Sequence, residues 1–147
     1  MEQQAIITVK DLRTYFYSDK RCNKVLNGVS FELYKGRTLC VVGESGCGKS
    51  VTAYSIMQIL ADTGRITSGH ILYKGQDLTT WDARQMSGFR GKCCSIVFQD
   101  PMTSLNPVTT VGDQIAEAVM AHEKIGKKQA WEKALEMLET VGISRER

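Results

Sequence analysis

One eight-residue segment of this 147-residue chain combines the residue types that bind phosphate groups. Residues 43–50 read Gly-Glu-Ser-Gly-Cys-Gly-Lys-Ser and fit the spacing G-x-x-x-x-G-K-[ST]. Glycines let a backbone turn tightly around a phosphate so that successive N–H groups point inward, and the first turn of a following helix adds its positive end. In this spacing Lys49 reaches the β- and γ-phosphates of a nucleotide, and the Ser50 hydroxyl binds Mg²⁺. The segment therefore predicts a nucleotide-binding loop.

The sequence on either side of this loop predicts the elements that the motif needs. An apolar run at residues 38–42 predicts a β-strand before the loop, and residues 51–60 place apolar side chains at helical spacing after it. A chance match in a glycine-containing turn is the alternative, and the order strand, loop, helix counts against it. We expect nucleotide contacts from nine consecutive residues: Gly43, Glu44, Ser45, Gly46, Cys47, Gly48, Lys49, Ser50 and Val51.

The composition counts against several other functions. The net charge is only +3, with Lys and Arg scattered along the chain, which does not favour binding to nucleic acid. The five cysteines contain no C-x-x-C pair, so we expect neither a disulfide framework nor a zinc site, and a reducing cytoplasm fits this pattern. No apolar run approaches the roughly 18 residues of a membrane-spanning helix. We therefore expect a chain that does not cross a membrane by itself.

Further strands and helices follow from the apolar pattern. Alternating or short apolar runs predict four more strands, at residues 5–17, 25–33, 70–73 and 95–98. A short helix is predicted within residues 79–91, and longer helices follow Thr110 and cover residues 127–141. Thr110 is the expected N-cap of the first of these two longer helices, and Gly142 is the expected C-terminal stop of the second.

A second block of sequence distinguishes between the classes of protein that contain such a loop. Gln99 follows the predicted strand at residues 95–98, some fifty residues after Lys49, and is followed by Asp-Pro-Met-Thr-Ser-Leu-Asn-Pro. The D-x-x-G and N-K-x-D motifs of GTPases do not occur. With these residues the chain resembles the nucleotide-binding subunits of ABC transporters. The resemblance is closest to the oligopeptide and dipeptide (nickel/peptide) importer branch, and it rests on residues 42–46, 98–107 and 111–115.

This resemblance implies a fold and a domain organisation. The expected fold is α/β: a P-loop NTPase (RecA-like) core with an N-terminal antiparallel β subdomain and the start of a helical subdomain, and it is incomplete. Residues 1–98 would form the β subdomain and P-loop core. Residues 99–109 would form the Q-loop, and residues 110–147 the start of the helical subdomain.

The resemblance also implies roles for two residues outside the phosphate loop. Gln99 matches the Q-loop glutamine, whose side chain approaches Mg²⁺ and the attacking water; it joins Lys49 as a catalytic candidate and Ser50 as a metal candidate. The alternative for an isolated Gln at this place is a solvated strand end. Phe16 aligns with the aromatic position that stacks on adenine. Tyr15 and Tyr17 remain alternatives for that contact, and Phe16 is otherwise an ordinary aromatic residue packed in the core.

Other parts of the family's catalytic machinery are missing from the sequence. No run of four apolar residues followed by Asp and Glu occurs after Gln99, so the Walker B strand is absent. The signature L-S-G-G-Q is absent as well. Residues 86–89 imitate only its beginning, and we expect them to be a surface segment. His70 and His122 precede the place of the switch histidine, so we expect both at the surface. The chain therefore resembles the N-terminal half of an ATPase domain, with exposed apolar edges and poor solubility.

Two functions follow for this half-domain. In the first, the complete protein uses Mg²⁺ and ATP on the cytoplasmic face of the cell membrane and couples ATP hydrolysis to the import of peptides or similar small solutes. Its partners would be transmembrane permease subunits and a second nucleotide-binding subunit, with a solute-binding protein acting indirectly. In the alternative, the chain is a truncated nucleotide-binding fragment with no turnover of its own.

Overall fold

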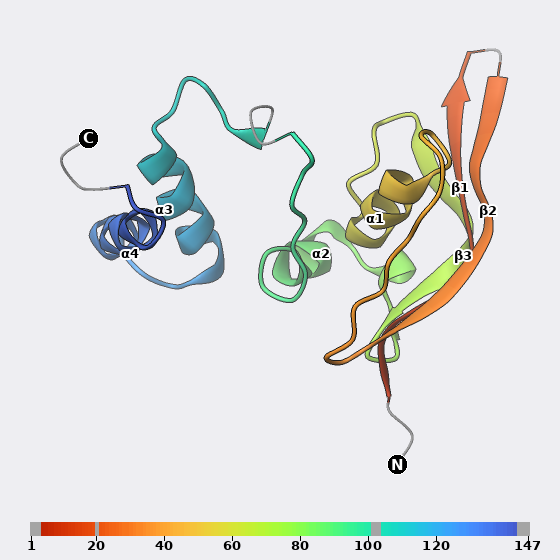
Figure 1. Cartoon of the computed structure of the whole chain (residues 1–147), viewed down its shortest axis with the longest axis horizontal. Helices are drawn as coiled ribbons and strands as arrows, with labels where there is room; N and C mark the ends of the chain where they lie inside the picture. The colour runs from red at the N-terminus through yellow and green to blue at the C-terminus, as the bar shows by residue number, and fades with distance from the viewer. Residues whose placement is uncertain (1–3, 20, 101–103, 144–147) are drawn as a thin grey trace. The chain divides into compact units, whose positions relative to one another are not determined.

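The computed structural model describes residues 4–19, 21–100 and 104–143. The chain divides into two compact units, Met1–Ser87 and Gly88–Arg147 (Figure 1). The first unit contains a β-sheet and the helix that follows the predicted phosphate loop. The second contains a pair of longer helices.

The sheet of the first unit has four antiparallel strands in the order β2-β1-β3-β4. Its two long strands, β1 (Ala5–Ser18) and β2 (Arg21–Tyr34), confirm the two strands predicted from the alternating pattern near the N-terminus. Strand β3 (Gly64–Tyr73) begins six residues before the predicted strand, and β4 (Gln76–Asp77) returns after a tight turn. The antiparallel β subdomain is therefore present.

A β-bulge in the centre of β1 keeps its apolar side chains on one face. Ile7 and Val9 are buried, and after the bulge the buried positions resume at Leu12. The register shifts between Val9 and Leu12, and Asp11 adopts a left-handed backbone with φ 46°. On the neighbouring strand β3, a Cβ at Gly69 would lie 2.4 Å from the Asp11 carbonyl oxygen. The bulge therefore requires a glycine beside it.

Helix α1 (Lys49–Met57) lies over one face of this sheet (Figure 1). A buried hydrogen bond of 2.9 Å joins the hydroxyl groups of Thr14 on β1 and Ser55 on α1. The helix ends at Gln58, which has a left-handed backbone with φ 49° and donates its side-chain amide to the Leu78 carbonyl oxygen. The helix therefore stops three residues short of its predicted end at residue 60.

The segment after β4 forms η1 (Leu78–Thr80) and α2 (Ala83–Phe89), which confirms the predicted short helix. The expectation of a surface segment at residues 86–89 is wrong for two of its members. Met86 is 1% exposed and Phe89 is 2% exposed. Residues three apart lie on one face of a helix, so both buried side chains belong to the same face of α2. His70 and His122 are both exposed, as expected.

The second unit is built around a helical hairpin. Helices α3 (Val111–His122) and α4 (Lys127–Thr140) confirm the two predicted helices, with Thr110 as the N-cap of α3. Gly142 follows α4 with φ 82°. Small side chains let the helices approach closely, and the buried cluster consists of Ala116, Val119, Ala130 and Ala134. Within the described ranges, every helix is too short or too polar to span a bilayer.

Two predicted strands are not formed. Residues 38–42 and 95–98 have no strand structure, and Val42 and Val97 are 87% and 96% exposed. Their residue types suit a buried parallel sheet, but a strand forms only against a neighbouring strand that takes its hydrogen bonds. The described residues supply no such neighbour for either segment. Both predictions were therefore wrong for this structure.

Candidate nucleotide-binding site

The phosphate loop ends in a glycine that opens helix α1. Gly48 is the N-cap of α1, with φ 97°, and no side chain caps the first turn. A Cβ at Gly48 would lie 2.8 Å from Leu26 Cδ2 and 3.3 Å from the Val25 carbonyl oxygen, so a larger residue would collide with β2. The first N–H groups of a helix have no partner within the helix. This end of α1 therefore presents uncapped donors and positive charge to the loop.

The side chain of Lys49 turns back into the loop. Its Nζ donates to the carbonyl oxygens of Gly43 at 2.8 Å and Glu44 at 2.7 Å. In the described part of the chain, no Asp or Glu side chain forms an ion pair with this half-buried ammonium group. Lys49 therefore brings a positive charge without a carboxylate partner to the start of α1.

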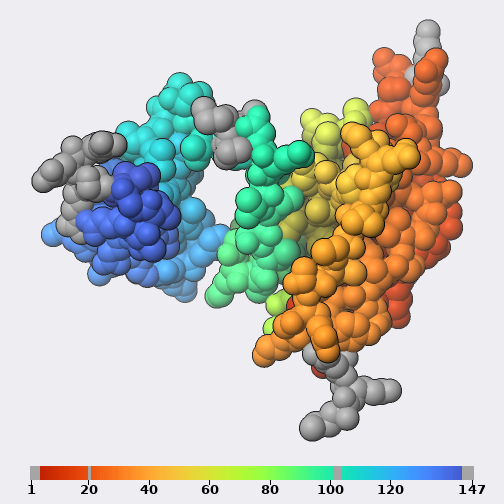
Figure 2. All heavy atoms as spheres, in the orientation of Figure 1, coloured from red at the N-terminus to blue at the C-terminus, as the bar shows by residue number. Residues whose placement is uncertain are grey.

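The remaining loop residues lie around this charge. The Cys47 N–H donates to the Glu44 carbonyl oxygen at 3.3 Å, and the Cys47 thiol lies 3.7 Å from Lys49 Nζ. The same thiol covers Gly43, where a Cβ would lie 2.7 Å from it. Ser45, Gly46 and Ser50 are exposed, and the loop and α1 are visible as orange-to-yellow spheres on the surface of the first unit (Figure 2).

These features fit a polyphosphate group. Backbone N–H groups at a helix start, together with one ammonium group, are the donors that phosphate oxygens require. The exposed hydroxyl of Ser50 follows directly and is a hard oxygen ligand of the kind that Mg²⁺ prefers. Contact of residues 43–51 with a nucleotide, as expected from the sequence, stays a prediction.

The three candidate adenine-binding aromatics lie at the end of β1, in the same unit as the loop. Phe16 is half-buried, and a Cβ at Gly64 would lie 2.9 Å from its ring. Alternate residues of a strand share a face, so Phe16 shares the face of Thr14, which bonds to α1, whereas Tyr15 and Tyr17 share the other. Of the three, Phe16 is therefore on the α1 side, in contact with its own sheet. Its contact with a base stays a prediction.

Gln99 belongs to the second unit. It is exposed and follows residues 95–98, which form no regular secondary structure. The carbonyl oxygen of the next residue, Asp100, accepts a hydrogen bond of 3.1 Å from the Ser104 hydroxyl. Pro101, Met102 and Thr103, which contribute to the family resemblance, lie outside the described residues.

The comparisons with known proteins identify the family. Residues 26–147 match the family described as ABC transporter. The chain belongs to the ABC transporter family. It is 48% identical over 140 residues to the "Probable peptide ABC transporter ATP-binding protein y4tR" of Sinorhizobium fredii, and 47% identical over 141 residues to the dipeptide transport ATP-binding protein DppD of Bacillus subtilis. Each alignment covers 95% of this chain and 42% of the relative. The chain therefore spans about two fifths of the length of these relatives.

A solved structure shows the same fold. The dimeric ATP-binding cassette MJ0796, bound to ADP and Pi, matches with a TM-score of 0.75 at 17% sequence identity. The match covers 95% of this chain and 59% of the cassette. The α/β fold expected from the sequence, incomplete relative to the ABC cassette, is confirmed.

Two sets of contacts in this ABC family chain were not predicted from its sequence. The buried hydrogen bond between Thr14 and Ser55 joins α1 to the sheet. The feature of the sequence that could have indicated it is a hydroxyl residue, Thr14, among the apolar residues of one strand face. The side chain of Gln114 on α3 bonds to the loop before that helix. No residue pattern distinguishes such a glutamine from a solvated one.

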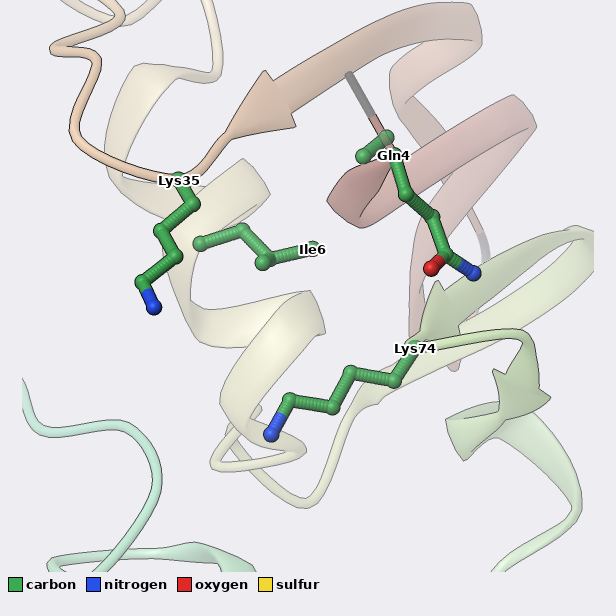
Figure 3. A pocket seen from close by; sticks show the side chains of 5 residues that line it. Gln4, Ile6, Lys35 and Lys74 are labelled. Carbon is green, nitrogen blue, oxygen red and sulfur yellow. The ribbon is translucent and has the colours of Figure 1, made fainter. Parts of the chain in front are cut away.

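A separate pocket lies where β1 begins and where β2 and β3 end. It has a volume of about 540 Å³ and is lined by Gln4, Ala5, Ile6, Lys35 and Lys74. The two lysine side chains extend on either side of Ile6 (Figure 3). None of these residues belongs to the phosphate loop, and the pocket is wide open. Among the described residues, no group of three or more His, Cys, Asp or Glu side chains is placed to hold a metal ion.

Proposed function

We propose that residues 43–51 of this chain bind the phosphates of ATP. The observation that carries this proposal is the position of Lys49, whose ammonium group is held by two loop carbonyl oxygens beside the uncapped start of α1. An anion placed there gains a charge-assisted hydrogen bond and the favourable end of the helix dipole.

Each candidate residue has a distinct role in this proposal. Lys49 neutralises the charge of the β- and γ-phosphates, and the loop N–H groups fix the positions of their oxygens. Ser50 would hold Mg²⁺, which when bound bridges phosphate oxygens and neutralises developing charge. Gln99 would orient a water molecule towards the γ-phosphate and approach the same ion. Phe16 would contact the adenine ring, with Tyr15 and Tyr17 as alternatives.

For the complete protein, we propose ATP hydrolysis coupled to the import of peptides or similar small solutes. The names of the similar relatives, which include peptide and dipeptide transport ATP-binding proteins, support this proposal. The complete protein would act at the cytoplasmic face of the membrane with transmembrane permease subunits and a second nucleotide-binding subunit. A solute-binding protein would act through the permease.

A second candidate function applies to the chain as given: nucleotide binding without turnover. The sequence contains no Walker B Asp-Glu pair after an apolar strand and no signature motif. The Walker B pair would help to hold Mg²⁺ and polarise the attacking water. Without these groups the phosphate loop holds the nucleotide but nothing activates the water.

Titration with a fluorescent ATP analogue in the presence of Mg²⁺ tests nucleotide binding. The Lys49→Ala variant should weaken binding about ten- to hundredfold, because a hydrogen bond to a charged group contributes about 1.5–3 kcal/mol. Lys10→Ala, at an exposed position of β1, is the matched control and should leave the affinity unchanged. Binding that does not saturate, or that is equal in Lys49→Ala, would count against the proposed site.

Steady-state ATP hydrolysis decides between the two functions of the chain itself. We expect no turnover above that of the Lys49→Ala variant. Turnover by the unmodified chain that disappears in Lys49→Ala would show that the missing motifs are not needed, and would rule out the non-catalytic assignment.

A further inference from the structure

The side chain of Gln114 on α3 holds the backbone of the loop that follows Gln99. The Asn106 N–H donates to Gln114 Oε1 at 2.9 Å. In the other direction, Gln114 Nε2 donates to the carbonyl oxygens of Asn106 at 3.0 Å and Thr109 at 3.1 Å. One half-buried carboxamide thus satisfies a backbone donor and two backbone acceptors that would otherwise need water.

The same loop has two further hydrogen bonds of its own. Asn106 Oδ1 accepts from the Val108 N–H at 3.1 Å, which closes a local turn. The Ser104 hydroxyl donates to the carbonyl oxygen of Asp100, the residue directly after Gln99. Ser104 is joined to Asn106 only through Leu105, so the route from Gln114 to the residue next to Gln99 combines these hydrogen bonds with a short covalent link.

Helix α3 does not depend on Gln114 for its own placement. Its N-terminus is capped by Thr110, whose Oγ1 accepts from the Asp113 N–H at 3.1 Å. Gly112 packs against the Trp131 ring of α4 so closely that a Cβ would lie 2.5 Å from the ring. The buried small residues between α3 and α4 complete this contact. The hairpin is therefore a fixed base to which Gln114 attaches the loop.

We propose that Gln114 is a positioning residue that fixes the segment after Gln99 to the α3–α4 hairpin. The proposal rests on the proposed function, since it gives the position of Gln99 a role in ATP hydrolysis. Gln114 acts through the backbone at Asn106 and the Ser104–Asp100 hydrogen bond, and it is not a catalytic residue.

Solution NMR of the full chain tests this, with amide exchange and backbone order parameters as readouts. In Gln114→Met, which keeps the side-chain length but removes all three hydrogen bonds, the Asn106 amide should exchange about fivefold faster or more. The Gln99 order parameter should fall while those of α3 and α4 stay unchanged. Gln129→Met, the same substitution at an exposed position of α4, should change none of these values. An unchanged Gln99 order parameter in Gln114→Met would overturn the proposal.

A second variant separates positioning from packing. In Gln114→Glu one carboxyl oxygen can still accept from the Asn106 N–H, and the other replaces Nε2 and faces two carbonyl oxygens. When protonated, this second oxygen can donate to one of them, and when ionised it repels both. The Gln99 order parameter of this variant should therefore be higher near about pH 4 than near about pH 7. The unmodified chain is the reference at each pH. It carries the same carboxyl groups at Asp100, Asp113 and Glu117, so the difference between the two chains reports on residue 114 alone. Equal order parameters at both pH values, or a loss of α3 protection together with that of the loop, would show that Gln114 only packs.

The nucleotide titration separates this proposal from the proposed function. Gln114→Met leaves the phosphate loop intact, so its affinity for the ATP analogue should equal that of the unmodified chain. If the unmodified chain binds no nucleotide while Gln99 still loses order in Gln114→Met, the proposed function fails and the positioning contact stands.

Discussion

Alkylation of Cys47 can test whether a nucleotide is bound at the phosphate loop. Its thiol is exposed, covers Gly43 and lies 3.7 Å from Lys49 Nζ. A nucleotide held by the loop would cover this thiol, so saturating MgATP should slow its alkylation by iodoacetamide. At a nucleotide concentration about ten times Kd, the rate should fall about tenfold. Mass spectrometry of the tryptic peptide measures the rate.

Cys22 provides the internal control for this measurement. It is also exposed, but it lies at the start of β2, outside residues 43–51. Its alkylation rate should be the same with and without nucleotide. Equal rates for Cys47 in both conditions, or equal slowing of both cysteines, would contradict binding of nucleotide at the loop.

Single residues differ in how far their roles can be inferred from sequence. A role for Lys49 could be predicted because the phosphate loop is a local motif, in which the residue types and their spacing indicate the chemistry. Gln114 was not identified, because its hydrogen bonds to Asn106 and Thr109 depend on how a loop folds back on a helix. The sequence alone does not distinguish a glutamine that hydrogen-bonds to water from one that hydrogen-bonds to a backbone.

Among the elements, the bulge in β1 should tolerate no side chain at Gly69. An alanine there combines an unfavourable φ of 90° with a Cβ 2.4 Å from the Asp11 carbonyl oxygen. Gly75→Ala is the control, because Gly75 has a similar φ of 84° but no atom within 4 Å of a Cβ. We expect Gly75→Ala to cost about 1 kcal/mol of unfolding free energy and Gly69→Ala at least about 2 kcal/mol more. Urea denaturation measures both, and equal costs would contradict a steric role for Gly69.

The turn between β4 and η1 should stabilise the fold in a pH-dependent way. Burial alone would raise the pKa of Asp77, but hydrogen bonds with His70 and Thr79 outweigh it and hold that pKa below its ordinary value. Because the folded-state pKa is lowered, the stabilisation is present above the ordinary Asp pKa and is lost as pH falls through the folded value. Asp77→Ala should therefore lower the free energy of unfolding by about 1 kcal/mol near neutral pH and by less below about pH 4.

Denaturant unfolding of Asp77→Ala at several pH values checks this expectation. Asp62→Ala, at an exposed position outside this turn, is the control and should show no comparable change. A cost for Asp77→Ala that is the same at every pH would mean that only the neutral contacts of the turn matter.

The sequence predicted those elements whose stabilising contacts are local or adjacent in the chain. The strands β1 and β2 form one hairpin, and α3 and α4 pack against each other across a short connection. The strands predicted at residues 38–42 and 95–98 did not form, because an apolar run indicates burial but not the neighbour that provides it. Their residue types alone could not show whether such a neighbour is present.

For the whole molecule, the same two segments leave large apolar side chains exposed. Val42 and Val97 are 87% and 96% exposed, and the adjacent Phe98 is 43% exposed. Extended apolar segments that expose their backbone can pair with another copy of the chain. We therefore expect the purified chain to associate with itself as its concentration rises, as measured by sedimentation velocity.

Val97→Lys should reduce this association, because a lysine on an exposed apolar segment opposes pairing between chains. Val108→Lys is the matched control: Val108 is 85% exposed, but it lies in the loop whose backbone is bonded to itself and to Gln114. Both variants add the same charge, so general repulsion should affect them equally. A larger decrease in association for Val97→Lys than for Val108→Lys would locate the contact at residues 95–98. Equal decreases would instead assign self-association to net charge and contradict a role for the apolar segment at residues 95–98.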